Sequence, residues 1–177
     1  MDRHQSPTPG EHRQNAPQRV VCAVVTVSDT RTLADDKSGA TIVELLEGAG
    51  HAVAARTIVP DEPDELDMAI RELVVHPSVA VILITGGTGI APRDQTPDAV
   101  GRLFTRELPG FGELFRMLSF EEIGAAAMLS RATAGMIDRT AVFLMPGSTA
   151  AVRLAMQRLI IPELGHLAKL AAKESGR

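Results

Sequence analysis

The sequence predicts an α/β protein, a three-layer α/β/α sandwich around a mostly parallel sheet. Three observations predict this fold class. Short continuous runs of β-branched and other apolar residues indicate buried strands. The segments between these runs repeat their apolar residues every three or four positions, as amphipathic helices do. The two patterns alternate along the chain, which is typical of helices packed on both faces of a parallel sheet.

The chain has 177 residues, a length that predicts one domain. Residues 1–18 contain three prolines and almost no apolar side chains, so we expect a disordered tail there. A single domain is then expected over residues 19–177.

Composition excludes several classes of protein. The net charge is −4, there is no Trp or Tyr, and no block of basic residues occurs, so nucleic-acid binding is not expected. No apolar run approaches the roughly 20 residues of a membrane span, and the N-terminus lacks the apolar core of a signal peptide. A cytoplasmic protein without membrane contact is therefore expected.

The single cysteine, Cys22, lies inside the first apolar run. One cysteine can form no disulfide within the chain, and a zinc cluster of thiolates is excluded. Its position predicts a buried, inert thiol. The five histidines show no pair four residues apart, so no histidine metal site is expected.

The first half of the domain begins with a strand over residues 20–27. A polar loop over residues 28–38 follows. Apolar residues at i, i+3, i+4 and i+7 from Ile42 predict a short helix that ends near Gly50. A second strand is expected from about residue 51 to residue 59.

The next helix has one apolar stripe over residues 66–74, and Pro77 stops it. A third strand over residues 79–85 leads into a glycine-rich turn. Thr96 is then the predicted N-cap of a further helix, with Pro97 at its first position.

Residues 109–130 carry more apolar surface than one helix stripe can bury. The excess belongs either to the core or to a subunit interface. Two strands over residues 132–137 and 140–145 follow, joined at Asp138 and Arg139. Ser148 is expected to cap the next helix, and Pro162 to begin the last one.

The sequence ITGGTGIAPRDQTP, residues 84–97, places three glycines directly after the third strand. Ligands of open α/β sheets bind beyond the carboxyl ends of the strands, where bare N–H groups can form a nest for anions. A turn that only reverses the chain is the alternative. A Walker loop is absent because no Gly-Lys pair exists, and Pro92 occupies the third glycine position of a dinucleotide fingerprint. The turn therefore predicts a phosphate-binding loop of another kind.

The stretch GGTGIAPRDQTP resembles the GGTGxxxRDxT signature of the molybdopterin-binding family, which includes MoaB, MogA and the G domains of gephyrin-type proteins. VSDT, DKSG, VPDE, PGFGELFR, LSRATAG and MPGS continue the resemblance in the family's order over roughly residues 20–170. SFEEIGAAAMLSRA and MPGS are closer to the MoaB branch than to the MogA branch. The CinA type shares the fold, but its GGLGPTxDDxT loop differs at Thr88 and Arg93, so it ranks below.

The resemblance implies the molybdopterin-binding fold and adenylylation of molybdopterin. The terminal phosphate of molybdopterin would attack the α-phosphorus of Mg-ATP and release pyrophosphate, a reaction that depends on positioning and charge neutralisation. Mg²⁺ prefers one or two carboxylates plus phosphate oxygens, and the resemblance assigns catalysis and metal binding to Asp61 and Asp94. Spacing alone favours Asp61 as a helix N-cap ahead of Pro63, and Asp94 could be a loop residue.

Further residues are expected to bind ATP or molybdopterin. They are Ser28, Asp29, Asp36, Ser38, Gly39, Gly86, Gly87, Thr88, Gly89, Arg93, Pro109, Gly110, Glu113, Ser130, Arg131, Pro146, Gly147 and Ser148. Arg131 could fork onto the pterin phosphate. Alternatives stay open: Ser38 and Ser148 as plain N-caps, Ser28 and Asp29 as loop caps, and Arg93 and Glu113 as solvated charges.

The family also implies a homo-oligomer, a trimer or a hexamer, and other proteins of the molybdenum cofactor pathway as partners. A non-catalytic molybdopterin- or nucleotide-binding module of the same pathway is the alternative function. Both Asp61 and Asp94 are present, which favours the enzyme. The sequence does not distinguish ATP from GTP.

Overall fold

The computed structural model describes residues 17–172, so of the expected tail only Pro17 and Gln18 fall within the described residues. A six-stranded sheet has the order β2-β1-β3-β6-β5-β4. The strands are β1 Val21–Val27, β2 Ala52–Val59, β3 Val81–Thr85, β4 Arg106–Glu107, β5 Thr133–Ile137 and β6 Thr140–Met145. The helices are α2 Lys37–Gly48, α3 Pro63–Val74, α4 Thr96–Gly101, α5 Pro109–Ile123, the 3₁₀ helix η1 Gly124–Leu129, α6 Thr149–Ala155, the π-helix η2 Met156–Ile160 and α7 Ile161–Ala172.

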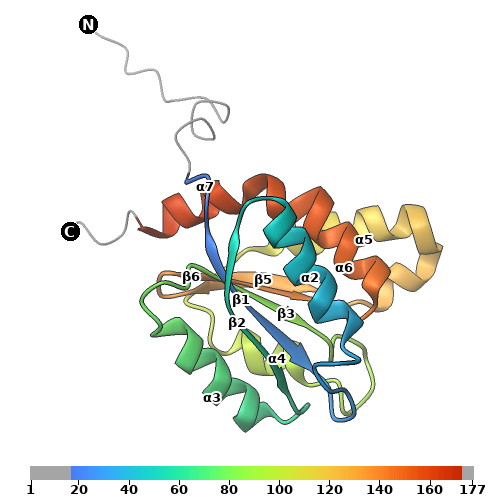
Figure 1. The fold of residues 1–177 in the computed structure, drawn as a ribbon. Helices are drawn as coiled ribbons and strands as arrows, with labels where there is room; N and C mark the ends of the chain where they lie inside the picture. The colour runs from blue at the N-terminus through green and yellow to red at the C-terminus, as the bar shows by residue number, and fades with distance from the viewer. Residues whose placement is uncertain (1–16, 173–177) are drawn as a thin grey trace, which may run out of the picture.

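The strand order decides which loops meet. Strands β2, β1, β3 and β6 are parallel neighbours, whereas β5 is antiparallel to β6 and β4 is antiparallel to β5. Thr85 of β3 pairs with Thr26 of β1 on one side and Met145 of β6 on the other. The carboxyl ends of the parallel strands therefore form one edge of the sheet, and the loops that follow them lie together (Figure 1).

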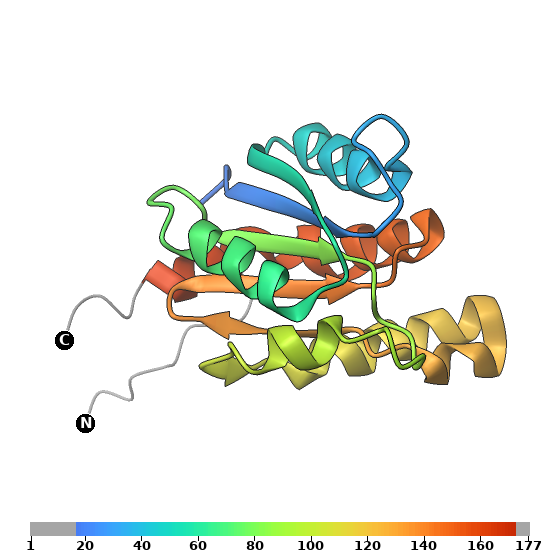
Figure 2. The same ribbon diagram turned by 90° about the horizontal axis from the view of Figure 1, so that it is seen from below.

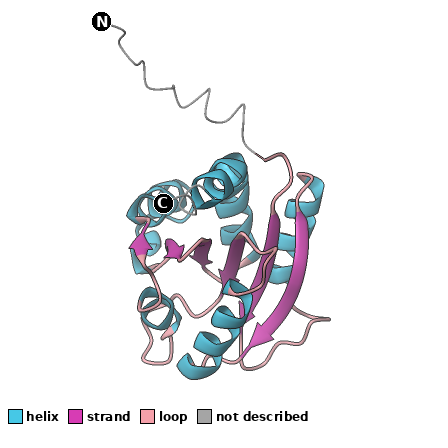
Figure 3. Cartoon of the chain, turned by 90° about the vertical axis from the view of Figure 1, so that its left-hand side faces the viewer, coloured by secondary structure: helices cyan, strands magenta, loops and turns pink. Residues whose placement is uncertain are grey.

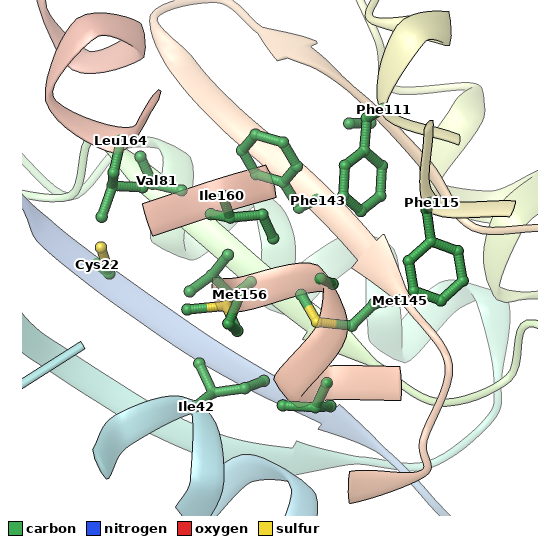
Figure 4. Close-up of a cluster of buried hydrophobic side chains, with 14 of the residues drawn as sticks. Cys22, Ile42, Val81, Phe111, Phe115, Phe143, Met145, Met156, Ile160 and Leu164 are labelled. Carbon is green, nitrogen blue, oxygen red and sulfur yellow. The ribbon is translucent and has the colours of Figure 1, made fainter. Parts of the chain in front are cut away.

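Helices cover both faces of the sheet, which confirms the predicted three-layer α/β/α class (Figures 2 and 3). Side chains alternate along β1: Cys22 and Val24 pack into one core with α2, α5 and the C-terminal helices, and Ala23 and Val25 pack into the other core with α3 and α4. Figure 4 shows the first core, where Met156 and Ile160 lie between Ile42 and Phe143. Cys22 is buried, as predicted, and burial raises the pKa of its thiol to about 12.

Helix α5 resolves the apolar excess of residues 109–130 into two faces. Phe111, Phe115 and Leu118 are buried in the core. Phe120 and Ile123, by contrast, are 61% and 59% exposed. The core explanation therefore holds for one face of α5, and the other face needs another explanation.

Two elements differ from expectation. The two-residue strand β4, Arg106–Glu107, is too short to produce a periodic pattern and was not predicted. Pro162 does not begin a separate last helix, because α6, η2 and α7 follow one another without a loop. Pro162 has no N–H to donate, and it lies in the first turn of α7 directly after the π-helical segment. No helix between residues 17 and 172 is long and apolar enough to cross a membrane.

Candidate functional site

A polar groove of about 530 Å³ opens at the carboxyl edge of the sheet. It is bounded by the loops after β1, β3 and β6 and by the start of α2. Of the residues expected to bind ligand, those that line it are Ser28, Ser38, Gly86, Gly87, Thr88, Gly89, Asp94, Gly147 and Ser148. The tertiary structure thus brings together residues from four separate motifs of the sequence.

The glycines of the turn make room for protein atoms packed around it. Gly86 and Gly87 have positive φ angles of 114° and 61°, a region that side chains disfavour. A Cβ at Gly87 would overlap the Thr96 hydroxyl and lie 3.1 Å from Oδ2 of Asp61. A Cβ at Gly89 would lie 2.5 Å from Oδ2 of Asp94. Both carboxylates therefore lie against the glycine loop, and the missing side chains permit that approach.

Asp61 follows β2 and is partly buried. Its Oδ1 accepts a hydrogen bond from the Thr96 hydroxyl at 3.2 Å, and its N–H donates to Oδ1 of Asp29 at 3.1 Å. Burial raises the pKa of Asp61, and the nearby charges of Asp94 and Asp29 raise it further, against the hydrogen bond from Thr96 and the charge of Arg93. A cation placed here would relieve this repulsion.

The expected N-cap role of Thr96 is wrong, and the alternative role of Asp61 as an N-cap is not observed. Glu62 occupies the N-cap position of α3, so Asp61 is not the cap. Helix α4 begins at Thr96 itself, with Gln95 as its N-cap residue. The Thr96 hydroxyl is directed instead to Asp61, because the fold places α4 beside the loop after β2.

Asp94 lines the groove from the far end of the glycine loop. Its Oδ2 accepts a hydrogen bond from the Ala91 N–H at 2.9 Å. Within residues 17–172 no group of three or more His, Cys, Asp or Glu side chains could hold a metal ion. Asp61 and Asp94 lie close enough for their charges to interact. Magnesium binding by these two carboxylates, a ligand number that Mg²⁺ accepts, stays a prediction.

Arg93 is exposed and joins the loops after β1 and β2. Its Nε donates to Oδ2 of Asp29 at 2.9 Å, and its Nη2 lies 3.2 Å from Oε1 of Glu62. The arginine is therefore not free of contacts, and the hydrogen bond from Arg93 is the main cause that lowers the pKa of Asp29. Neither residue lines the groove.

Arg131 stabilises the glycine loop through hydrogen bonds to its carbonyl groups. Its main-chain N–H donates to the Thr88 carbonyl at 3.0 Å, and its Nε donates to the Gly89 carbonyl at 2.8 Å. Its two terminal nitrogens donate to the Asp94 carbonyl and to Oδ2 of Asp98. The guanidinium is thus occupied by protein acceptors, and its contact with a phosphate stays a prediction.

Asp36 organises the start of α2. Its carboxylate is buried and accepts hydrogen bonds from the Gly39 N–H, the Thr26 and Ser38 hydroxyls, and Nη2 of Arg56, all between 2.8 and 3.0 Å. Burial alone would raise the pKa of Asp36, but these hydrogen bonds outweigh it and lower the pKa. Asp36 is therefore the N-cap of α2, and the expected capping role of Ser38 is wrong. Ser148 does cap α6, by accepting from the Ala151 N–H.

Other expected residues do not line the groove, and Asp61 and Arg131 are among them. Pro109, Gly110 and Glu113 are exposed at the amino end of α5. The Ser130 hydroxyl accepts from the Ala132 N–H, and the Pro146 carbonyl accepts from the Thr85 hydroxyl. Asp36 and Gly39 lie behind the lining and support it.

The groove also contains residues that sequence reasoning missed. Thr26, Thr30, Arg31 and Thr85 line it. Thr26 and Thr85 are polar residues within otherwise apolar strands, and this break in the apolar pattern could have marked them as site residues. Arg31 had no such signal, because it is one arginine in a polar loop.

Comparison with known proteins identifies the family of this chain. A family model described as a probable molybdopterin binding domain matches residues 23–166. Molybdenum cofactor biosynthesis protein B of Bacillus subtilis is 54% identical over 165 residues, which covers 93% of this chain and 97% of that protein.

Solved structures agree as well. A crystal structure of a molybdenum cofactor biosynthesis protein B has a TM-score of 0.87 at 51% identity, over 90% of this chain and 99% of the other. The tungsten cofactor synthesizing protein MoaB of Pyrococcus furiosus has a TM-score of 0.79 at 40% identity, over 88% and 99%. A CinA protein from Thermoplasma acidophilum shares only the fold, with a TM-score of 0.56 at 16% identity over 80% and 96%. The chain therefore belongs to the molybdopterin-binding family of molybdenum cofactor biosynthesis, and within it to the MoaB branch.

Proposed function

We propose that this chain is a Mg²⁺-dependent adenylyltransferase that transfers AMP from ATP to molybdopterin. The observation that carries the proposal is the position of Asp61 and Asp94, whose carboxylates both lie against the glycine loop of the groove. A binding module has no need for two repelling carboxylates beside its anion-binding loop. An adenylyltransferase needs them, because carboxylates can hold the divalent cation that neutralises the triphosphate while the α-phosphorus is attacked.

The reaction needs little covalent chemistry from the protein. A phosphate oxygen of molybdopterin forms a bond to the α-phosphorus of ATP, the bond from that phosphorus to the bridging oxygen breaks, and pyrophosphate leaves. The main-chain N–H groups of residues 87–89 would bind phosphate oxygens, since the Gly86 N–H already donates to the Met145 carbonyl, and Asp61 and Asp94 would hold the magnesium ion. When bound, that ion neutralises charge on the phosphates. Thr96 keeps Asp61 in place, and Arg131 keeps the loop in shape.

A product assay tests the proposal. The purified chain is mixed with molybdopterin, ATP and Mg²⁺, and pyrophosphate and adenylylated pterin are measured; EDTA should stop the reaction. We expect Asp61→Asn and Asp94→Asn each to abolish turnover while the fold is kept. Asp138→Asn, at the turn between β5 and β6, is the matched control, because Asn tolerates the positive φ of 50° at that position.

Two outcomes would contradict parts of the proposal. Normal turnover in both aspartate variants would remove these residues from the mechanism. Ligand-dependent stabilisation of the wild type without any product would make the chain a binding module of the pathway. Thermal shifts with ATP and GTP, measured in the same series, identify the preferred nucleotide.

The exposed face of α5 and η1 supports a homo-oligomer as part of this proposal. Several large apolar side chains of this face are 47–77% exposed; they are Leu114, Met117, Phe120, Ile123, Met128 and Leu129. Exposed apolar side chains in this number on neighbouring helices are typical of an interaction site. Light scattering of the wild type and of Phe120→Asp tests the homo-oligomer. The variant should form smaller species than the wild type. A monomeric wild type would refute the homo-oligomer.

A further inference from the structure

We propose that Arg31 is a phosphate-binding residue of the groove and that Ser38 and Asp36 position it. The inference deepens the proposed function, on which it rests for the identity of the ligand. Its ligand class is a phosphate group of a substrate, either the polyphosphate of a nucleotide or the phosphomonoester of the pterin.

Arg31 has the place and the charge for this role. Among the residues 17–172 that line the groove, it is the one cationic side chain, and Asp94 is the one anionic side chain. The Arg31 side chain is 41% exposed, so a ligand in the groove can reach it. Its main-chain N–H donates to the Ser28 hydroxyl at 3.2 Å, which fixes the loop that carries it.

One edge of the Arg31 guanidinium is held by α2. Nη1 donates to the Ser38 hydroxyl at 2.9 Å, and that hydroxyl donates in turn to Oδ1 of Asp36 at 2.9 Å. No other donor of this guanidinium contacts an acceptor in the described part of the chain. The remaining N–H groups can therefore turn toward a phosphate, for which a planar arginine fork is well suited.

Asp36 does not neutralise the positive charge of Arg31. Arg56 approaches Oδ2 of Asp36 to 3.0 Å and neutralises that buried carboxylate, whereas Nη1 of Arg31 stays 3.9 Å from Oδ1. The charge of Arg31 is thus available to a ligand. The groove has a cation at the α2 side and the Asp94 carboxylate beside the glycine loop, an arrangement that suits a phosphate group together with a divalent cation.

Calorimetric titrations with Mg-ATP, inorganic pyrophosphate and molybdopterin test the inference. We expect Arg31→Ala to weaken binding by about 10- to 100-fold, the effect typical of a lost charge-assisted hydrogen bond. Arg31→Lys should recover only part of the affinity, since lysine offers charge without the fork. Ser38→Ala should weaken binding by a smaller factor, because the charge stays and its anchor is lost. Arg139→Ala, an exposed arginine at the β5–β6 turn, is the matched control and should bind as the wild type does.

Comparison of the titrations with the three ligands identifies which phosphate Arg31 contacts. Weakening with ATP and pyrophosphate alone assigns it to the nucleotide, and weakening with molybdopterin alone assigns it to the pterin. Equal affinity of Arg31→Ala and Arg139→Ala for all three ligands overturns the inference and leaves the proposed reaction intact. If the wild type makes no adenylylated pterin while binding still depends on Arg31, the reaction fails and the inference holds. A wild type that binds none of the three ligands overturns both.

Discussion

The Thr96 hydroxyl donates a hydrogen bond to Oδ1 of Asp61, 3.2 Å away, and so joins the start of α4 to the loop after β2. Thirty-five positions separate the two residues in the chain. The contact also passes beside Gly87, where any side chain would overlap the Thr96 hydroxyl. One buried threonine thus fixes both a carboxylate and the loop proposed to bind phosphate.

Thr96→Val should weaken both stability and activity. The change keeps the shape of the side chain but removes the donor to Asp61, so we expect a loss of about 1–3 kcal/mol in the free energy of unfolding. Turnover should fall more than substrate binding, because Asp61 is no longer fixed. Urea unfolding and steady-state kinetics measure the two effects. Thr96→Ser keeps the hydroxyl and should behave much like the wild type; if it fails as badly as valine, the hydrogen bond is not the cause.

Gly87→Ala should be destabilising by about 1–3 kcal/mol, because the residue has a φ of 61° and its new Cβ would meet the Thr96 hydroxyl. Ligand binding should be lost with the loop conformation. Gly101→Ala, at the end of α4, meets no atom within 4 Å and should leave the free energy of unfolding unchanged or slightly raised. Equal unfolding midpoints for the two variants in urea would contradict the strain that we assign to Gly87.

Asp36 should give the protein an acid-sensitive part of its stability. Its pKa in the folded chain is lowered, so its carboxylate adds stability above the unfolded pKa of roughly 3.9. That contribution disappears as the pH falls through the lower, folded pKa. Asp36→Asn removes the charge but retains a side chain that can cap a helix, and it should cost about 1–3 kcal/mol at neutral pH.

Urea unfolding at several pH values between 7 and 3 measures this effect. The difference between the wild type and Asp36→Asn should be constant down to about pH 4 and shrink below it. A difference that persists unchanged at pH 3 would show that the shape of the side chain, and not its charge, stabilises the start of α2.

Arg131→Ala should loosen the glycine loop. The guanidinium donates to the carbonyls of Gly89 and Asp94, so its removal should speed amide hydrogen exchange across residues 86–96 and lower turnover. Arg102→Ala, an exposed arginine outside the groove, serves as the control. Unchanged exchange combined with weaker molybdopterin binding would instead support direct contact between Arg131 and the pterin phosphate.

The sequence was enough for the fold class and for much of the groove. Buried strands and amphipathic helices depend on side chains a few positions apart, so their alternation can be read directly from spacing. The glycine-rich turn after β3 could be recognised for the same reason, because three glycines within four positions indicate that other atoms lie close to the main chain. Motif resemblance added Asp61, for which spacing alone favoured a capping role.

The tertiary structure decided how the parts act together. The cap of α2 by Asp36, the brace that Arg131 forms around the loop, and the entry of Arg31 into the groove depend on contacts between separate segments. Those contacts follow from the strand order β2-β1-β3-β6, which brings four loops to one edge. Local spacing carries no record of that order, because it results from the packing of whole helices and strands against two hydrophobic cores.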